Sequence, residues 1–358
     1  MKIAFLGDIA FVGKFDLQKN PFVYGSLNEI ADFLKQFDYV IANLESPITD
    51  TEVTGAYKAI HLKASSTNIN LLRFLNIGIV NLSNNHIFDY GVTGYQDTIN
   101  LLDKNEIEYF GIDDKQVILN FENNRLAFSG YSCYSSNGTR YRGEKDHHYI
   151  TSITTHNIEK RLKEDEQNGY LSVLSFHWGV ENVNYPAYEH IRFARRIAEK
   201  FNFILYGHHP HVVQGMEKIN NSLISYSLGN FIFDEVNSKT IKDLKNKMND
   251  NNRTSYILSL EANNNQLEDI EIIHIFEKDG KISIVDNPMF EKYCNDLNLS
   301  TGDYYALRNG KLQEHLREMN IKHDFSWFLK RLNRNFIVAY LRGRRNTASY
   351  NKIFNEYK

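Results

Sequence analysis

Five short apolar runs in the first 211 residues are each followed, within a few positions, by a side chain that commonly binds metal ions. Segments with helical spacing of apolar residues separate most of these runs, and such alternation is typical of β-strands joined by helical crossovers. We therefore predict a layered α/β domain with its functional site beyond the carboxyl ends of the strands. The runs are Lys2–Leu6, Tyr39–Ala42, Gly78–Leu82, Leu171–Phe176 and Phe203–Tyr206.

Apolar residues spaced three and four apart predict the helices between these strands. The clearest case extends from Tyr188 to Phe201, where charged residues separate the apolar positions. Helical spacing also covers Leu27–Phe37, Asn68–Leu75 and Thr93–Asn105.

The pattern changes after residue 215. Four further apolar runs are separated by polar turns, and Asp279-Gly280 has the composition of a hairpin turn. We predict that these runs form a second, largely antiparallel sheet packed on the first. They are Leu223–Leu228, Tyr256–Leu260, Leu267–Phe276 and Lys281–Val285.

Three histidines in four positions follow the fifth run. On an extended backbone, residues two apart point to the same face, so His209 and His211 can aim at one point. Pro210 between them fixes its own φ and limits the geometries open to the pair. We expect His209 and His211 to bind a metal, and we assign His208 to the surrounding layer and to substrate binding. The alternative is a solvated histidine-rich turn.

The other runs are followed by the remaining side chains that a metal site needs. Carboxylates, amides and imidazoles together suit a borderline transition metal such as Mn, Fe or Zn, whereas an all-oxygen set would indicate Mg or Ca. The candidates are Asp8, Asn43, Glu45, Asn85, His86, Asp89, His177 and Glu181.

Composition narrows the class of protein. The net charge of −3 over 358 residues, together with the lack of interleaved basic and aromatic residues outside the tail, argues against a nucleic-acid-binding protein. Two cysteines cannot build a disulfide framework. The apolar runs are too short to span a membrane, and the chain starts directly with a strand, so we expect a cytoplasmic protein.

Six segments, in this order, resemble the bacterial CapA family, which is named for capsule and poly-γ-glutamate synthesis. They are Gly7-Asp8, Ala42–Glu45, Asn84–Gly91, His177–Glu181, His208–Gly215 and Ser227–Phe233. CapA proteins are similar in turn to calcineurin-like metallophosphoesterases. The resemblance implies a four-layer α/β/β/α sandwich with one or two metal ions at the strand ends.

The resemblance also implies roles for the metal-binding candidates. Asp8 and His211 would bind a first metal, and Asn85, His177 and His209 a second. Glu45 would bridge the two metals, with Asn43 as a competing candidate in the same turn.

The same resemblance suggests catalytic and substrate-binding residues. His86 would interact with the scissile group, and Asp89 would orient it or cap the following helix. Glu181 would act as a base or a substrate contact, and the alternative is a surface carboxylate. The loop from Val53 to Lys63 brings basic groups, including Lys63, which suit an anionic small-molecule or polymer substrate.

One departure from the wider superfamily bears on catalysis. Its first motif is usually Asp-x-His, whereas Asp8-Ile9-Ala10 has an alanine in the third position. The primary hypothesis is a metal-dependent hydrolase acting in capsule or cell-surface polymer biosynthesis. The alternative is a non-hydrolytic accessory protein that binds an anionic polymer or a synthase complex: Ala10 favours it, and His86 favours the enzyme.

The last part of the chain leaves the family pattern. We predict a CapA-like metallophosphoesterase domain over residues 1–286 and a helical, basic extension over residues 287–358. Residues 312–319 have helical spacing, and the segment Phe325–Arg345 holds six Lys or Arg and no acid from Trp327 onward. Such a basic amphipathic stretch either packs on the catalytic domain or contacts a membrane surface or an acidic partner.

Overall fold

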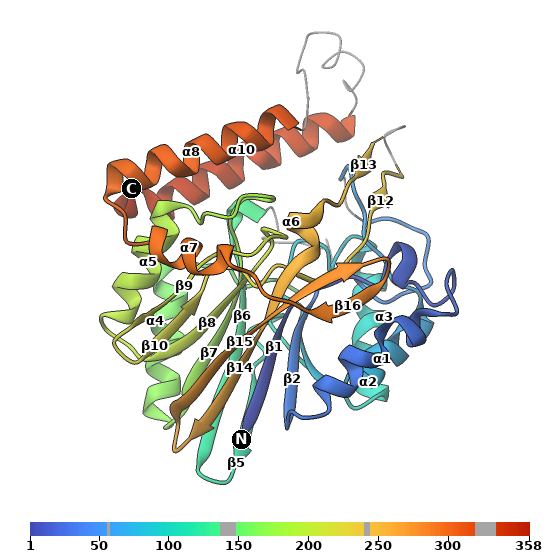
Figure 1. The fold of residues 1–358 in the computed structure, drawn as a ribbon. Coiled ribbons are helices and arrows are strands. Elements are labelled where there is room, and N and C mark those ends of the chain that lie inside the picture. Colours follow the sequence, from blue (N-terminus) through green and yellow to red (C-terminus); the bar gives the residue numbers. More distant parts are fainter. Residues whose placement is uncertain (56–57, 137–147, 240–243, 319–333) are drawn as a thin grey trace.

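Two large β-sheets lie face to face in this computed structural model, with helices on their outer sides (Figure 1). The structure describes residues 1–55, 58–136, 148–239, 244–318 and 334–358. The first sheet has the order β16 (Lys281–Ile284), β15 (Gln266–Lys278), β14 (Thr254–Asn263), β1 (Lys2–Ile9), β2 (Tyr39–Leu44), β3 (Ile77–Asn81) and β4 (Glu108–Phe110), and β11 (Asn230–Ile232) also pairs with β1.

The second sheet carries the remaining long strands. Its order is β5 (Val117–Phe121), β6 (Asn124–Ser132), β7 (Leu171–His177), β8 (Phe203–His208), β10 (Ser222–Ser225) and β9 (Met216–Ile219). A short ribbon pairs β12 (Val236–Asn237) with β13 (Lys245–Asn246).

Helices cover the outer face of each sheet. The first sheet packs on α1 (Val23–Leu34), α2 (Ile69–Phe74) and α3 (Gly91–Lys104), and the second on α4 (Thr155–Gln167) and α5 (Tyr188–Ala198). The chain also forms η1 (Gly13–Phe15), η2 (Ser66–Asn68), η3 (Tyr134–Ser136), α6 (Asp250–Arg253), α7 (Met289–Asp296), α8 (Thr301–Glu318), α10 (Arg334–Phe354) and η4 (Asn355–Tyr357).

Strand alternation in β1 shows how the layers are built. Ala4 and Leu6 belong to the core shared with the helices, whereas Ile3 and Phe5 belong to the core between the sheets. Side chains that alternate between faces in this way bury both sides of a strand. The Phe5 ring lies 4.7 Å from the Tyr206 ring of the second sheet. The predicted four-layer α/β/β/α fold is confirmed.

Two details of the predicted topology are wrong. The five predicted strands do not form one sheet, because β1, β2 and β3 belong to the first sheet and β7 and β8 to the second. The later strands do not form a separate antiparallel sheet either, because β14, β15 and β16 extend the first sheet from the free edge of β1. Hydrophobic periodicity identifies strands but does not determine their neighbours.

The predicted hairpin at Asp279-Gly280 is confirmed. Lys278 pairs with Lys281 across β15 and β16, and both turn residues have positive φ, 53° and 88°. Two-residue turns of this kind match the twist of the strands, and glycine takes such a conformation without steric cost.

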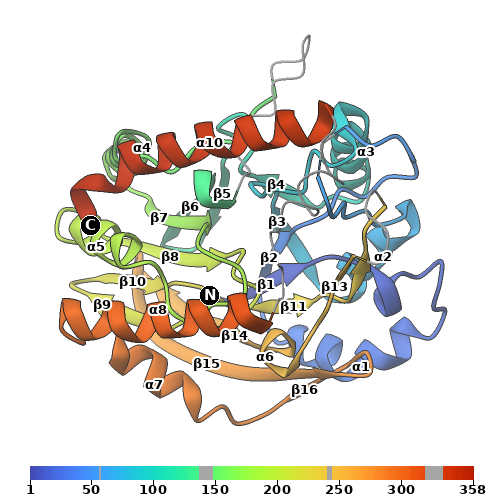
Figure 2. The ribbon, with the colours of Figure 1, turned by 90° about the horizontal axis from the view of Figure 1, so that it is seen from above.

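The C-terminal helices pack on α5. Tyr304 of α8 donates a hydrogen bond to the Pro186 carbonyl at 2.8 Å, and the Tyr350 hydroxyl of α10 lies 3.1 Å from His190 Nε2. Seen from above, α8 and α10 lie on either side of β8 (Figure 2). The first part of the predicted basic stretch, residues 325–333, lies outside the described residues, and its contact with a membrane surface or partner stays a prediction. None of the described helices is long and apolar enough to span a membrane.

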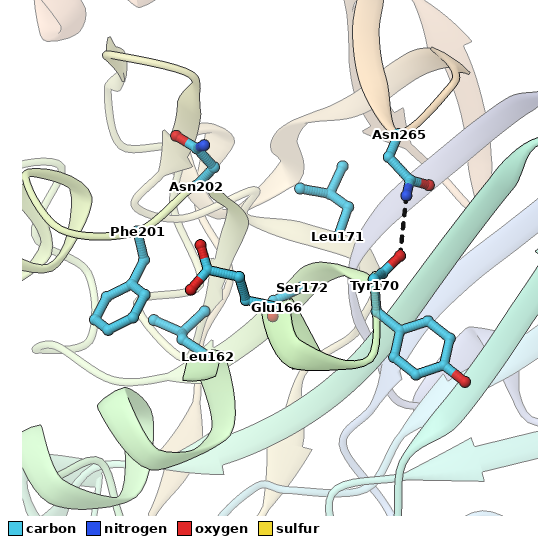
Figure 3. Close-up of a pocket in the computed structure, with 9 residues that line it drawn as sticks. Leu162, Glu166, Tyr170, Leu171, Ser172, Phe201, Asn202 and Asn265 are labelled. Atoms are coloured by element: carbon cyan, nitrogen blue, oxygen red, sulfur yellow. Dashed lines mark hydrogen bonds between the residues drawn. The ribbon is translucent and has the colours of Figure 1, made fainter. Parts of the chain in front are cut away.

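A small pocket of about 250 Å³ lies between α4, β7 and the segment after α5 (Figure 3). Its lining includes Leu171 and Ser172 at the amino end of β7, and Asn265 donates a hydrogen bond to the Gly169 carbonyl at 3.1 Å beside it. Because β7 runs about 20 Å from this end to His177, at roughly 3.3 Å per residue, the pocket is remote from the predicted site.

The buried His190 gives the C-terminal packing a pH dependence. Its ring stacks on Trp178 at 4.6 Å, and burial lowers the pKa of His190 from 6.5 to about 3. The unfolded chain therefore takes up this proton first as the pH falls. We expect His190 to reduce the free energy of unfolding by about 1.4 kcal/mol per pH unit below pH ~6.

Urea unfolding of a His190→Phe variant between pH 7 and pH 5 checks this expectation. The variant retains a stacked ring and should lose less stability over this interval than the wild type. A variant at the exposed His156, His156→Gln, is the control. Equal pH slopes for wild type and His190→Phe would contradict the assignment.

Candidate metal centre

Side chains that follow strands of both sheets meet at one place. Asp8 lies in β1 and Glu45 directly follows β2, whereas His177 ends β7 and His209 follows β8. His177 Nε2 lies 3.7 Å from Glu45 Oε1, which joins the two sheets across the site. The carboxyl ends of parallel strands thus deliver imidazoles from one sheet and carboxylates from the other.

Two groups of potential metal ligands share Glu45. One contains Asp8, Glu45 and His211, and the other Glu45, His177 and His209, with the ligand atoms of each group within 4.8 Å of one another. Asn85 lies beside the second group, with its Oδ1 2.9 Å from His177 Nε2. A carboxylate common to both groups occupies the place of a bridging ligand.

Asn43, the competing candidate, lies beneath Asp8. Its Nδ2 donates a hydrogen bond to Asp8 Oδ1 at 2.8 Å, and its Oδ1 accepts one from Asn81 Nδ2 at 3.0 Å. All three side chains are buried. Both polar atoms of the Asn43 amide are thus engaged, and the amide holds the Asp8 carboxylate in position.

The imidazole of His208 also contacts Asp8. Its Nδ1 lies 2.9 Å from Asp8 Oδ1, and the ring is fully buried. The backbone N–H of His209 donates to the other carboxylate oxygen at 3.1 Å. These contacts place His208 behind Asp8, in the layer that surrounds the candidate ligands.

Asn230 sets the tautomer of His211. His211 Nδ1 lies 2.9 Å from Asn230 Oδ1, and because an amide oxygen accepts, we assign the proton to Nδ1. His211 Nε2, which lies 3.6 Å from Glu45 Oε1, then carries the free lone pair. Partners of this kind orient a ligating imidazole and raise its basicity. Asn230 belongs to the segment Ser227–Phe233, in which the sequence predicts no residue that orients a ligand.

The prediction that His209 and His211 lie on an extended backbone is wrong. His209 and His211 have φ values of 93° and 57°, in the left-handed region that non-glycine residues avoid. Asn252 holds this conformation by donating to the His211 carbonyl at 3.1 Å. The two rings converge because the backbone turns at Pro210, and such strain costs about 1–3 kcal/mol per residue. No local sequence signal connects Asn252 to this turn.

The buried charges favour a bound cation. Burial, reinforced by the charge of Asp8, raises the pKa of Glu45 well above its ordinary value. Burial opposes ionisation of Asp8 too, yet its hydrogen bond with His208 holds the pKa of Asp8 well below the usual range. Neither Glu45 oxygen meets a hydrogen-bond donor among the described residues. Two adjacent buried carboxyl groups are costly without a positive partner, and a divalent metal supplies one.

The protonation state of the candidate imidazoles suits metal binding. Burial, with the neighbouring His209, lowers the pKa of His177 well below its ordinary value, and burial lowers the pKa of His209 to about 4. Both rings are therefore neutral near pH 7 and keep a lone pair for a metal. Mixed nitrogen and oxygen ligands fit a divalent transition metal.

A second constellation lies beside the ligands. His86 Nδ1 lies 2.6 Å from Asp89 Oδ2, and Lys58 Nζ lies 2.8 Å from Asp89 Oδ1. Burial lowers the pKa of His86 while Asp89 opposes this shift, and the charges of His86 and Lys58 hold the pKa of Asp89 below its ordinary value despite burial. Asp89 thus orients an imidazole whose Nε2 is available for proton transfer.

The two remaining candidates lie at the edge of the centre. Glu181 is exposed, and its carboxylate lies within 4.8 Å of ring nitrogens of His209 and His211. Lys63 Nζ pairs with Glu52 at 2.5 Å. Both side chains line a neighbouring pocket of about 780 Å³. The pocket is also lined by Tyr90 and Lys239.

A protein-family model matches the part of the chain that contains the candidate metal ligands. The model for the bacterial capsule synthesis protein PGA_cap matches residues 2–235, which include all the candidate ligands. The chain belongs to this family. The predicted relationship to CapA is therefore confirmed, and Asn252 and the strands β14–β16 lie beyond the matched residues.

Two curated relatives are CapA proteins. The chain is 29% identical over 247 residues to the PGA biosynthesis protein CapA of Bacillus subtilis, covering 66% of this chain and 64% of that one. It is 30% identical over 217 residues to the capsule biosynthesis protein CapA of Bacillus anthracis, covering 58% and 53%. The matches thus span less than two thirds of either relative.

Two solved structures of other proteins have a backbone similar to that of this chain. A calcineurin-like phosphoesterase from Bacillus subtilis has a TM-score of 0.42 and 11% identity, and covers 88% of this chain and 98% of its own. A 5'-nucleotidase precursor from Thermus thermophilus has a TM-score of 0.43 and 11% identity, with coverages of 89% and 59%.

Proposed function

We propose that this protein is a metal-dependent hydrolase that acts in the synthesis or processing of an anionic cell-surface polymer. The observation that carries the proposal is the meeting of buried carboxylates and imidazoles beside an oriented His86–Asp89 pair. A divalent metal bound here would supply an activated water and charge stabilisation. The relatives, named for PGA and capsule biosynthesis, support a polymer as the substrate.

In this proposal, one set of residues binds the metal and another transfers a proton. Asp8, Glu45, Asn85, His177, His209 and His211 would hold the metal. His86 Nε2 would exchange a proton with the reacting group, while Asp89 fixes the ring through Nδ1. Lys58 helps to keep Asp89 ionised and ties it to the loop that contains residues 58–63.

The neighbouring pocket carries charges of both signs, because Lys63 and Lys239 line it together with Glu52, which pairs with both lysines. Lys63 Nζ and Lys239 Nζ lie 5.3 and 5.2 Å from the centre of the Tyr90 ring, which the chain places directly after Asp89. The backbone N–H of Leu62 donates to Asp89 Oδ2 at 2.8 Å, so the pocket wall formed by His61 and Lys63 adjoins the His86–Asp89 pair. Its volume is within the range of small-ligand sites.

A second function is favoured by Ala10. Its side chain is buried against Val12, Leu62 and Phe233, so the described residues on this side of Asp8 are apolar and offer no ligand. A protein with fewer ligands can bind a polymer or a synthase complex without hydrolysing it. In that case the site would bind metal or anion without turnover, and His86 would have no catalytic role.

Metal analysis followed by hydrolysis assays tests the proposal. Protein purified without chelator should hold one or two transition metals per chain, and a His209→Ala/His211→Ala variant should hold none. The metal-loaded wild type should cleave phosphodiester or γ-glutamyl substrates. Wild type that contains no metal and takes up neither Mn²⁺, Fe²⁺ nor Zn²⁺ would rule out the hydrolase. Metal binding without cleavage of any substrate would favour the accessory role.

A further inference from the structure

We propose that Glu181 is a metal ligand that completes the centre from its solvent side. This inference rests on the proposed metal site and adds a residue to it. Glu181, His209 and His211 form a third group whose ligand atoms lie within 4.8 Å of one another. His209 also belongs to the group with His177, and His211 to the group with Asp8. A single carboxylate therefore faces one imidazole from each of the other groups.

The backbone holds Glu181 opposite these imidazoles. The loop after β7 crosses the loop after β8, and the Asn182 N–H donates to the Pro210 carbonyl at 2.7 Å. Gly179 has φ +99° and approaches Pro210 so closely that an added Cβ would lie 3.2 Å from its Cγ. Because Pro210 lies between His209 and His211, the carboxylate and the two rings are positioned by one interlocked pair of loops.

Asn252 ties the same two loops together. Its side-chain Nδ2 donates to Asn182 Oδ1 at 2.5 Å and to the His211 carbonyl at 3.1 Å. The side chain is buried, and Asn252 belongs to α6, which packs beside both loops. One amide thus holds the residue after Glu181 and one of its partner histidines at a fixed separation.

On the side of Ala10, the described residues offer no further ligand. Ala10 lies in an apolar cluster with Val12 and Phe233, and the Phe233 ring lies 4.9 Å from the His211 ring. Asp8, Glu45 and His211 then provide three ligands on their own. Structural and catalytic sites for transition metals use at least four coordinating groups, including water. Glu181 is the described carboxylate that can add one from the open side.

A cation also accounts for an unpaired atom. His209 is buried, and its Nδ1 has no hydrogen-bond partner among the described residues. Buried ring nitrogens are normally paired, and a bound metal is a partner that His209 can have.

Metal titration of Glu181 variants tests the assignment. Apo protein would be titrated with Zn²⁺ and with Mn²⁺ by calorimetry, and bound metal measured by elemental analysis after dialysis. We expect Glu181→Gln to lose one equivalent or to bind at least about 10-fold more weakly. Glu181→Asp and Glu181→His, which keep a ligand atom, should retain more of the affinity. Glu159→Gln, on the outer helix α4, removes one carboxylate remote from the centre and should match the wild type.

The outcomes separate this inference from the proposed function. Glu181→Gln with wild-type stoichiometry and affinity would overturn the inference while leaving the metal site intact. If that variant also lost hydrolysis, Glu181 would be a substrate contact or base instead. Wild type that binds no metal would overturn both proposals. Thermal unfolding of each apo variant shows whether a lost metal reflects a lost ligand or a lost fold.

Discussion

Glu45→Gln is expected to abolish stable metal binding. Glu45 belongs to both groups of candidate ligands, so its loss weakens both at once. Replacement of groups that merely orient ligands costs about 10–100-fold in metal affinity, and loss of a shared ligand should cost at least about 100-fold. Elemental analysis after dialysis and calorimetric titration of the apo protein measure the effect, and hydrolysis should fall with the bound metal.

The same substitution should stabilise the apo protein. Burial and Asp8 raise the pKa of Glu45, so the folded state resists ionisation of this carboxyl group above pH 4.5, where the unfolded chain releases its proton freely. Stability from the protonated carboxyl is therefore lost as the pH rises. Glutamine is neutral at every pH, and we expect the free energy of unfolding of apo Glu45→Gln at pH 7 to increase by about 0.5–2 kcal/mol.

Opposite effects on metal affinity and apo stability would distinguish a ligand from a structural residue. Asn43→Ala is the matched comparison, because Asn43 supports Asp8 through a hydrogen bond and belongs to none of the ligand groups found among the described residues. That variant should destabilise the apo protein, since it leaves buried polar groups unpaired. Full metal content in Glu45→Gln would contradict the bridging assignment.

His86→Ala should reduce hydrolysis while leaving metal content unchanged. General acid–base groups contribute about 10²–10⁴-fold to rates, so kcat should fall by that factor. His86 lies in none of the three ligand groups found among the described residues, and its Nδ1 is engaged by Asp89. Turnover and metal content measured on the same preparation check both parts of the prediction.

Two companion variants test how the imidazole is oriented. Asp89→Asn should lower kcat and alter the pH profile, because Asp89 holds Nδ1 and raises the basicity of the ring. Lys58→Met removes the ion pair with Asp89 and should have a smaller effect of the same kind. Unchanged turnover in His86→Ala, with metal bound, would show that this imidazole takes no part in the reaction.

Local sequence signals identified the strands and most candidate ligands. Each strand is a short apolar run, and each candidate ligand lies at its end or within a few positions after it, so both features lie within one window of sequence. The observed strands β1, β2, β3, β7 and β8 begin within one residue of their predicted starts. The fold class followed from the alternation of strands and helices and from the resemblance to CapA.

Interactions between distant segments were not predictable from the same signals. Asn230 and Asn252 support His211 from later segments, 19 and 41 residues away, and an asparagine in a loop carries no mark of such a partner. Lys58 pairs with Asp89 through a loop whose basic groups the sequence connected only with an anionic substrate. The positive φ of His209 and His211 depends on these contacts, because the residue types alone favour an extended chain.

The sequence by itself determined which segments become strands and which side chains stand at their ends, because hydrophobic periodicity and turn composition act over a few residues. The tertiary structure decided that these ends belong to two sheets, and that Glu45 of one faces His177 of the other. It also placed Glu181 against His209 and His211. Sheet pairing and loop crossing depend on burial and hydrogen bonds between residues far apart in the chain, which no local pattern records.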